Sequence, residues 1–323
     1  MPQPWECESS AMSWRRFPPV GLALLLPACA PAFAQTDLAP GRTVWAAFED
    51  QGEHRSFSVH LPPGDGNALP LVVVLHGGGS SGARMEDVTG WSALADREGF
   101  AVVYPDGLGG VLGLGRAWSY DGCCGYGALL GVDDIAMVEA LLSTLEARVD
   151  VDPHRRYVVG YSNGGTLAHG LASRSSDLFA AMGIYAGPVA ARGSLEAPIM
   201  PAAAPEPALS VMLVMSEQDP RVPFYGSEGR TVTPSQPQLA QFYAGAAGCA
   251  RHPDVTRTFD GAVDVHRFLG CRPGLAVEQL TLWGWNHEWP GHETIRGCRA
   301  PGEQLYEFDA ATQMWAFFRD KRR

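Results

Sequence analysis

Short, unbroken runs of apolar residues recur along this chain and predict buried strands. Runs of this length without alternation are typical of strands that are buried on both faces, as in a parallel sheet. The runs are residues 71–75, 100–104, 157–159 and 211–215. Residues 55–61 alternate instead and predict an edge strand, which the pair Pro62-Pro63 ends.

Helical spacing of apolar residues appears between these runs. Residues 132–147 have this spacing, with acidic residues at the start, where the positive end of a helix dipole favours them. Residues 165–173 and 312–319 predict two more helices. Alternation of strands and helices is typical of an α/β protein with right-handed crossovers.

The organisation of the chain indicates a single domain after a leader. Residues 186–208 are rich in Ala, Pro and Gly and predict a surface loop, and residues 35–47 predict a loose N-terminal segment. We therefore expect one domain over residues 35–323.

Composition narrows the choice of function class. Of the 323 residues, 46% are hydrophobic and 18% are charged, which suits a large core and argues against disorder. The formal net charge is −11, so the chain lacks the basic footprint of proteins that bind nucleic acid or an anionic membrane surface.

The first 34 residues predict a secretory signal peptide. Arg15 and Arg16 precede a short apolar stretch, and Ala32-Phe33-Ala34 supplies a small-x-small cleavage signal. The stretch is too short to span a bilayer. Residues 26–29 also resemble a lipobox, so the alternative is a lipid anchor at Cys29. We expect a secreted or periplasmic protein without a membrane span.

Five cysteines follow this leader, and export permits disulfides among them. They are Cys123, Cys124, Cys249, Cys271 and Cys298. None has the doubled C-x-x-C spacing of a zinc site. The favoured pairing is Cys249–Cys271 across a hairpin, and one of the adjacent pair at 123–124 is expected to bond to Cys298. An odd number leaves at least one thiol free or paired between chains.

The strongest chemical motif is Gly160-Tyr161-Ser162-Asn163-Gly164, which lies between a predicted strand and a predicted helix. A serine on such a sharp turn needs small neighbours two residues away on each side. The turn exposes the hydroxyl at the N-terminus of a helix, whose dipole favours a developing anion. This motif predicts Ser162 as a nucleophile.

A second glycine-rich turn, residues 76–79, directly follows the predicted strand at 71–75. The backbone N–H groups of Gly78 and Asn163 are the expected donors to a substrate oxyanion. We interpret His76, at the start of this turn, as structural.

The acid and base of a serine triad are expected after later strands. Asp219 follows the run at 211–215 and is preferred over Glu217 as the carboxylate. His287 follows a short predicted strand at 280–283 and is preferred over His292 as the base. Such a triad would cleave an ester through an acyl-enzyme, without a metal or another cofactor.

The acidic pair Asp133-Asp134 could suggest a cation site. Because it stands at a predicted helix start, we interpret it as a cap and dipole partner instead.

The motifs together resemble the polyhydroxybutyrate depolymerase / feruloyl esterase family, which includes acetylxylan esterases. They are LHGGG at 75–79, YPDG at 104–107, W-x(4)-CCG at 118–125, VDDIAMV at 132–138, GYSNGG at 160–165 and NHEWPG at 286–291. The resemblance covers nearly the whole mature chain. It implies the α/β-hydrolase fold, a mostly parallel central sheet with helices on both faces, and it assigns the triad to Ser162, Asp219 and His287.

The resemblance also implies the substrate class, an ester of a hydroxyalkanoate or a feruloyl or acetyl ester of a polysaccharide. Two departures stand near the site: Met215-Ser216 replaces the usual His-Gly, and Asn286 replaces a glycine. The absence of a polymer-binding module favours soluble esters. Trp118, Trp285 and Trp289 could stack an aromatic acyl group or pack the loop walls.

Two other functions fit the same pattern less well. A serine peptidase of this fold would normally carry a propeller or cap domain, for which the chain has no room. A non-catalytic cell-envelope binding protein would be expected to have lost part of the triad.

Overall fold

A computed structural model describes residues 38–64, 68–120, 124–189, 203–227, 233–291 and 307–323. These residues belong to one compact unit within Gln35–Arg323. The predicted signal peptide and Cys29 lie outside the described residues. No helix in the described ranges has the length and apolar character needed to cross a membrane.

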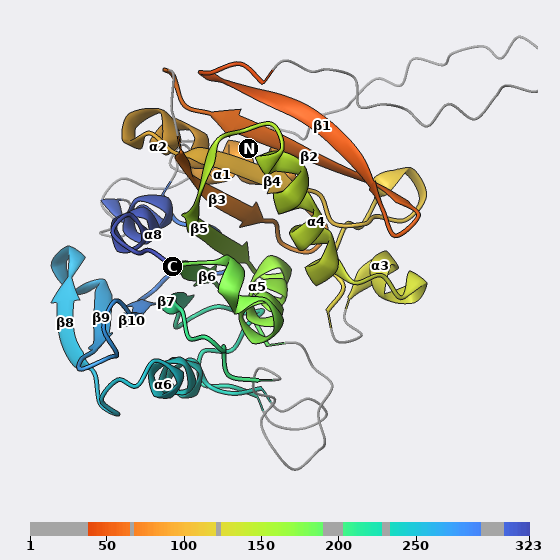
Figure 1. Cartoon of the computed structure of the whole chain (residues 1–323). Helices are drawn as coiled ribbons and strands as arrows, with labels where there is room; N and C mark the ends of the chain where they lie inside the picture. Colours follow the sequence, from red (N-terminus) through yellow and green to blue (C-terminus); the bar gives the residue numbers. More distant parts are fainter. Residues whose placement is uncertain (1–37, 65–67, 121–123, 190–202, 228–232, 292–306) are drawn as a thin grey trace, which may run out of the picture. The chain divides into compact units, whose positions relative to one another are not determined.

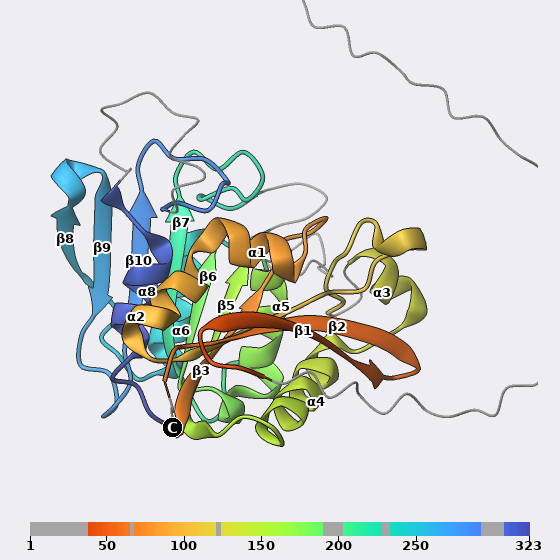
Figure 2. The ribbon, with the colours of Figure 1, turned by 90° about the horizontal axis from the view of Figure 1, so that it is seen from above.

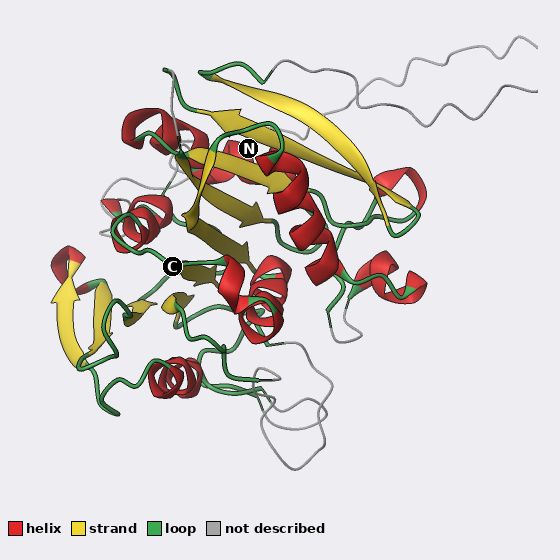
Figure 3. Ribbon diagram, viewed as in Figure 1, coloured by secondary structure: helices red, strands yellow, loops and turns green. Residues whose placement is uncertain are grey.

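The strands of the described chain form one sheet (Figures 1 and 3). They are β1 (Arg42–Asp50), β2 (Glu53–Leu61), β3 (Leu69–Leu75), β4 (Ala101–Pro105), β5 (Val151–Tyr161), β6 (Ala181–Tyr185), β7 (Ser210–Ser216), β8 (Asp254–Thr258), β9 (Val263–Phe268) and β10 (Val277–Leu282). Their order is β1-β2-β4-β3-β5-β6-β7-β10-β9-β8.

The middle of the sheet, from β4 to β10, is parallel throughout. The pairs β1–β2, β2–β4, β10–β9 and β9–β8 at the two edges are antiparallel. Seen from above, β5, β6, β7 and β10 run side by side (Figure 2). The prediction of a mostly parallel sheet is confirmed.

The helices lie on both faces of the sheet, as predicted. The α-helices are α1 (Gly82–Thr89), α2 (Trp91–Glu98), α3 (Gly125–Leu130), α4 (Asp134–Glu146), α5 (Asn163–Arg174), α6 (Gln236–Ala246) and α8 (Ala310–Phe318). Single 3₁₀ turns occupy Val111–Gly113, Ser176–Leu178 and Phe259–Gly261. In Figure 1, α2 and α8 lie on one side of the row of strands, and α4 and α5 lie on the other.

Aromatic side chains join the helices of one face to the sheet. The ring of Phe100 stacks on Trp315 of α8 at 3.9 Å between centroids, and Tyr157 of β5 stacks on Phe318 at 5.1 Å. All four residues belong to one buried cluster with the side chains of α1 and α2. Burial of such large rings removes much apolar surface from water and stabilises the packing of these helices on the sheet.

Two expectations at the N-terminal edge are wrong. Residues 42–50 form β1 rather than a loose segment, and β1 covers β2, which is therefore not the edge strand. The reason is that β2 pairs on both sides, with β1 in full register and with β4 over four residues.

The predicted disulfide between Cys249 and Cys271 is confirmed, with an S–S distance of 2.06 Å. It encloses the antiparallel hairpin of β8 and β9, so the hairpin is tied to the end of α6. Cys124 is also disulfide-bonded. The expected partner of this adjacent pair, Cys298, and the other member of the pair, Cys123, lie outside the described residues.

Candidate active site

Three side chains from distant parts of the sequence meet at one edge of the sheet. Ser162 follows β5, Asp219 follows β7 and His287 follows β10. Because these strands are parallel, their carboxyl ends lie at the same edge, where ligands of open α/β sheets bind. His287 Nε2 lies 2.9 Å from Ser162 Oγ, and His287 Nδ1 lies 2.6 Å from Asp219 Oδ2.

The backbone of Ser162 adopts a strained conformation, with φ of 52° and ψ of −117°. The glycines around it allow this turn. A Cβ at Gly160 would lie 2.4 Å from the carbonyl oxygen of Gly164, and a Cβ at Gly164 would lie 2.3 Å from that of Leu75. Any side chain at either position would therefore displace the serine.

The carboxylate of Asp219 is held from both sides. Its Oδ1 accepts hydrogen bonds from the backbone N–H groups of Arg221 and Val222, and its Oδ2 faces the imidazole. Burial tends to raise the pKa of Asp219, but these hydrogen bonds outweigh it and hold the pKa below its ordinary value. Asp219 therefore stays ionised beside His287.

The sequence offered Glu217 as an alternative acid and His292 as an alternative base. Glu217 uses its backbone N–H to bond to Leu282, and it is Asp219 that faces the imidazole. His292 lies outside the described residues.

The turn after β3 brings Gly78 beside the start of α5. A Cβ at Gly78 would lie 3.6 Å from Cβ of Asn163. The N–H groups of Gly79 and Ser80 donate to Arg116 and Gly77, respectively. In the described part of the chain, the N–H groups of Gly78 and Asn163 have no such partner and remain available to a ligand.

Behind this turn, His76 is fully buried and fixed in one tautomer. Its Nε2 accepts from the N–H of Gly107 at 2.9 Å, so Nδ1 carries the proton that it donates to the carbonyl of Gly77. Burial lowers the pKa of His76 to about 4. His76 is therefore neutral at ordinary pH, which agrees with its interpretation as a structural residue.

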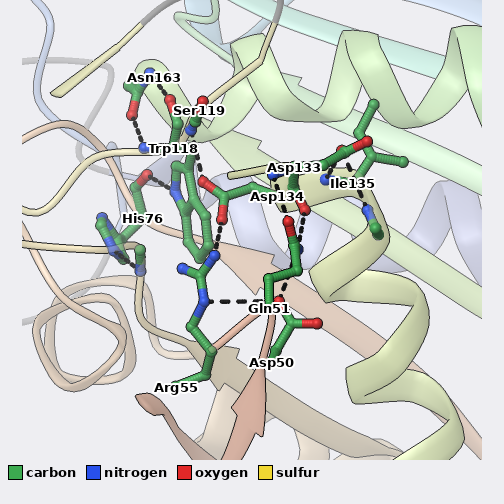
Figure 4. Close-up of polar contacts among 12 residues, drawn as sticks. Asp50, Gln51, Arg55, His76, Trp118, Ser119, Asp133, Asp134, Ile135 and Asn163 are labelled. Carbon is green, nitrogen blue, oxygen red and sulfur yellow. Dashed lines mark hydrogen bonds and ion pairs between the residues drawn. The ribbon is translucent and has the colours of Figure 1, made fainter. Parts of the chain in front are cut away.

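A polar network connects Asn163 to the body of the protein (Figure 4). The side-chain oxygen of Asn163 accepts from the backbone N–H of Trp118, whose indole N–H donates to the carbonyl of His76. The next residue, Ser119, donates its N–H to Asp134 at 2.6 Å. This network fixes the side chain of Asn163 on the nucleophile turn.

The acidic pair at the start of α4 splits between two roles. Asp133 caps the helix, since its side chain accepts from the N–H groups of Ile135 and Ala136, which confirms that part of the prediction. Asp134 is buried and forms an ion pair at 2.6 Å with Arg55 of β2, which is also buried (Figure 4). Burial raises the pKa of Asp134, and the charge of Arg55 counters this only in part.

The three tryptophans expected at the substrate site differ in position. Trp118 is fully buried, and Trp285 is buried with its indole N–H donating to the carbonyl of Glu288. These two side chains pack the loop walls and cannot stack on a ligand in this arrangement. Trp289 is buried as well, but it is the one of these three side chains that contributes to the lining of the cavity above Ser162.

A cavity of about 970 Å³ opens over Ser162 and His287. The glycine turn at 77–79 and the loop at 286–289 form two of its walls. This volume lies in the range typical of ligand pockets.

Two tyrosines that the sequence reasoning did not single out hold the loop of His287. The hydroxyl of Tyr161 donates to the carbonyl of His287, and that of Tyr185 donates to the carbonyl of Glu288 at 2.7 Å. Burial raises the pKa of Tyr161 to about 12, so its proton stays in place. Tyr161 occupies the first variable position of the Gly-x-Ser-x-Gly motif. A hydroxyl at that position, next to the serine, could have indicated a role in the site.

Residues 55–220, just over half of the chain, match the model of the family described as esterase PHB depolymerase. This chain belongs to the esterase PHB depolymerase family. The family is one of carboxylic ester hydrolases, and the matched segment includes the whole nucleophile motif.

Curated proteins similar to this esterase include two bacterial ones. NocK of Nocardia uniformis subsp. tsuyamanensis, named as an esterase, is 28% identical over 74% of this chain and 72% of its own length. Poly(3-hydroxyalkanoate) depolymerase C of Paucimonas lemoignei is 28% identical over 72% of this chain. The esterase spans 58% of the depolymerase.

A solved structure confirms the fold. The acetyl xylan esterase from Aspergillus awamori superposes with a TM-score of 0.56 at 14% identity, over 75% of this esterase and 92% of that protein. The predicted α/β-hydrolase fold is therefore confirmed.

Proposed function

We propose that this esterase cleaves carboxylic esters through an acyl-enzyme, with Ser162 as nucleophile, His287 as general base and Asp219 as its orienting carboxylate. One observation carries the proposal. The imidazole stands between a serine hydroxyl at 2.9 Å and a carboxylate at 2.6 Å, and Ser162, His287 and Gly78 line one cavity.

The reaction follows from this geometry. His287 Nε2 takes the proton of Ser162 Oγ as the oxygen attacks the ester carbonyl, and the N–H groups of Gly78 and Asn163 stabilise the oxyanion. The carbon–oxygen bond to the alcohol then breaks, and His287 returns the proton to the leaving alcohol. Water attacks the acyl-enzyme in the same way, which frees the acid and restores Ser162.

The names of the relatives support a choice of substrate. One relative is a poly(3-hydroxyalkanoate) depolymerase, and others are named feruloyl esterases or an acetylxylan esterase. We propose hydroxyalkanoate oligomers, or feruloyl or acetyl esters of polysaccharides, as substrates of this chain. The leader motif supports export of the mature protein.

Covalent labelling tests the nucleophile. A fluorophosphonate probe is expected to label the wild type, and Ser162→Ala is expected to lose both labelling and at least roughly 10⁴-fold in kcat. Ser143→Ala on α4 is a matched control, because this serine bonds only within its own helix at Glu139, and it should label normally. Persistent labelling of Ser162→Ala would show that another residue reacts.

A substrate panel tests the bond that is cleaved. It contains p-nitrophenyl esters, methyl ferulate, acetylated xylan, hydroxybutyrate oligomers and peptide amides. Esters should be cleaved, and cleavage of the amides alone would exclude the esterase mechanism.

A further inference from the structure

The catalytic cavity is positively charged within an acidic protein. The chain has 35 acidic and 24 basic residues. Among the described residues that line the cavity, however, three are arginines, Arg84, Arg116 and Arg221, and one is acidic, Glu288. A cleft lined by one sign of charge concentrates ligands of the opposite sign.

Two of these arginines already have partners. Arg84 forms an ion pair with Asp87 at 2.6 Å. Arg116 donates to the carbonyl of Gly113 and lies 3.8 Å from Asp106. Each of these two guanidinium groups therefore already has a partner within the protein.

Arg221 differs from both. Its backbone N–H bonds to Asp219, but its exposed guanidinium makes no hydrogen bond or ion pair with any residue in the described ranges. Its charge acts on the Tyr161 hydroxyl, where it opposes the rise in pKa. Arg221 also lines a second, smaller cavity of about 270 Å³. A free cation therefore stands next to the reacting groups, within reach of a bound ligand.

We propose that Arg221 binds a carboxylate of the substrate, so that this esterase prefers esters that end in a free acid. The inference rests on the proposed function. Every oligoester of a hydroxy acid ends in one carboxylate, separated from its terminal ester bond by a single monomer unit. Arginine recognises such a group through a planar pair of N–H donors. The preferred substrates are thus short hydroxyalkanoate oligomers cleaved near their acid end.

The side chain of Arg221 can be changed without removing the backbone contact to Asp219, because the N–H remains in any substitution except proline. The proposed contact between Arg221 and the substrate carboxylate lies away from the bond that breaks. It therefore stabilises the bound substrate and the transition state to the same extent. Its loss should therefore appear mainly as a higher KM for acidic substrates.

The test compares the 3-hydroxybutyrate dimer with its terminal carboxamide, which has the same scissile ester but no charge. Wild type should favour the free acid in kcat/KM by about tenfold, as expected for one charge-assisted pair at a partly exposed site. This ratio should fall towards one in Arg221→Gln and take an intermediate value in Arg221→Lys. It should also shrink as salt rises, because salt screens the charges.

Two other arginines serve as comparisons. Arg97→Gln, on the exposed face of α2, should keep the wild-type ratio. Arg84→Gln should keep it as well, since Asp87 already holds that guanidinium. Loss of the ratio in Arg84→Gln but not in Arg221→Gln would overturn the assignment.

The outcomes separate the two proposals. If wild type cleaves both dimers equally, or if Arg221→Gln keeps the full preference, the carboxylate site is wrong and the esterase mechanism stands. If neither the dimers nor any ester in the panel is cleaved, the proposed function fails and this inference fails with it.

Discussion

At the scale of single residues, Asp219 divides its two oxygens between different tasks. Oδ1 is occupied by two backbone N–H groups of its own loop, and Oδ2 is left for the imidazole of His287. The loop therefore fixes the carboxylate before any substrate binds. This arrangement favours the tautomer of His287 with its proton on Nδ1, which leaves Nε2 free to accept a hydrogen bond from Ser162 and, in the proposed mechanism, its proton.

Replacing Asp219 by asparagine tests this role. Asp219→Asn keeps an oxygen for the loop but favours the wrong tautomer of His287, so kcat on p-nitrophenyl acetate should fall by roughly 10⁴-fold. Glu217→Gln removes a carboxylate two residues away and should leave kcat unchanged. Equal activity of Asp219→Asn and wild type would exclude Asp219 as the orienting acid.

The meeting of Ser162, Asp219 and His287 could be predicted from the sequence because each residue follows a strand in a recognisable order. The free guanidinium of Arg221 and the loop contacts of Tyr185 could not be predicted. Their roles depend on which side chains surround them in space, and neither residue belongs to a motif with a fixed spacing.

At the scale of elements, most central strands were predictable, whereas the central strand β6 and several outer strands were not. Strands β3 and β7 and residues 157–159 of β5 form continuous apolar runs because both faces of the sheet are covered there. In β1, by contrast, only Val44 and Phe48 are buried, so the apolar signal in its sequence is weak.

Strand β6 was missed for a different reason. Its sequence, Ala-Met-Gly-Ile-Tyr, lacks a run of β-branched residues, although all five residues are buried. A Cβ at Gly183 would lie 2.8 Å from the sulfur of Met314 in α8. The close approach of that helix therefore requires glycine at position 183. Because glycine is unfavourable in strands, the sequence signal for β6 is weak.

A buried charge pair joins the start of α4 to strand β2. Arg55 of β2 and Asp134 of α4 are both buried and lie 2.6 Å apart, and Asp134 also accepts the N–H of Ser119. Removing Asp134 leaves the guanidinium of Arg55 buried with only Asp50, at 3.8 Å, as an acidic neighbour, and this loss costs more than the intact pair contributes.

We therefore expect Asp134→Ala to lower the free energy of unfolding by about 3–5 kcal/mol, measured by urea denaturation. The double variant Arg55→Met/Asp134→Leu removes both charges and should be less destabilised than Asp134→Ala. If the double variant loses as much stability as the sum of the two single variants, the two charges are not coupled.

At the scale of the whole molecule, two buried histidines make stability depend on pH. Burial lowers the pKa values of His76 and His169 to about 4, from an ordinary value of 6.5. Between pH 6.5 and 4 these two histidines are protonated in the unfolded chain but remain neutral in the folded chain. The contribution of these histidines to stability is thus complete above pH 6.5 and is lost as the pH falls towards 4.

The expected slope is roughly 1.4 kcal/mol per pH unit for each histidine, measured as the free energy of unfolding in urea between pH 6.5 and 4.5. His169→Gln can keep a hydrogen bond to Tyr243 and should reduce the slope by about half. A wild-type stability that does not change over this range would contradict the buried, neutral state of both rings.

The distance along the chain between the reacting groups has a consequence for translation. His287 is made 125 residues after Ser162, and helix α8, which completes the aromatic cluster, is made later still. A ribosome that stops early releases a serine turn with no imidazole to activate it. Interrupted products should therefore be inert towards the ester bonds of the cell that makes them.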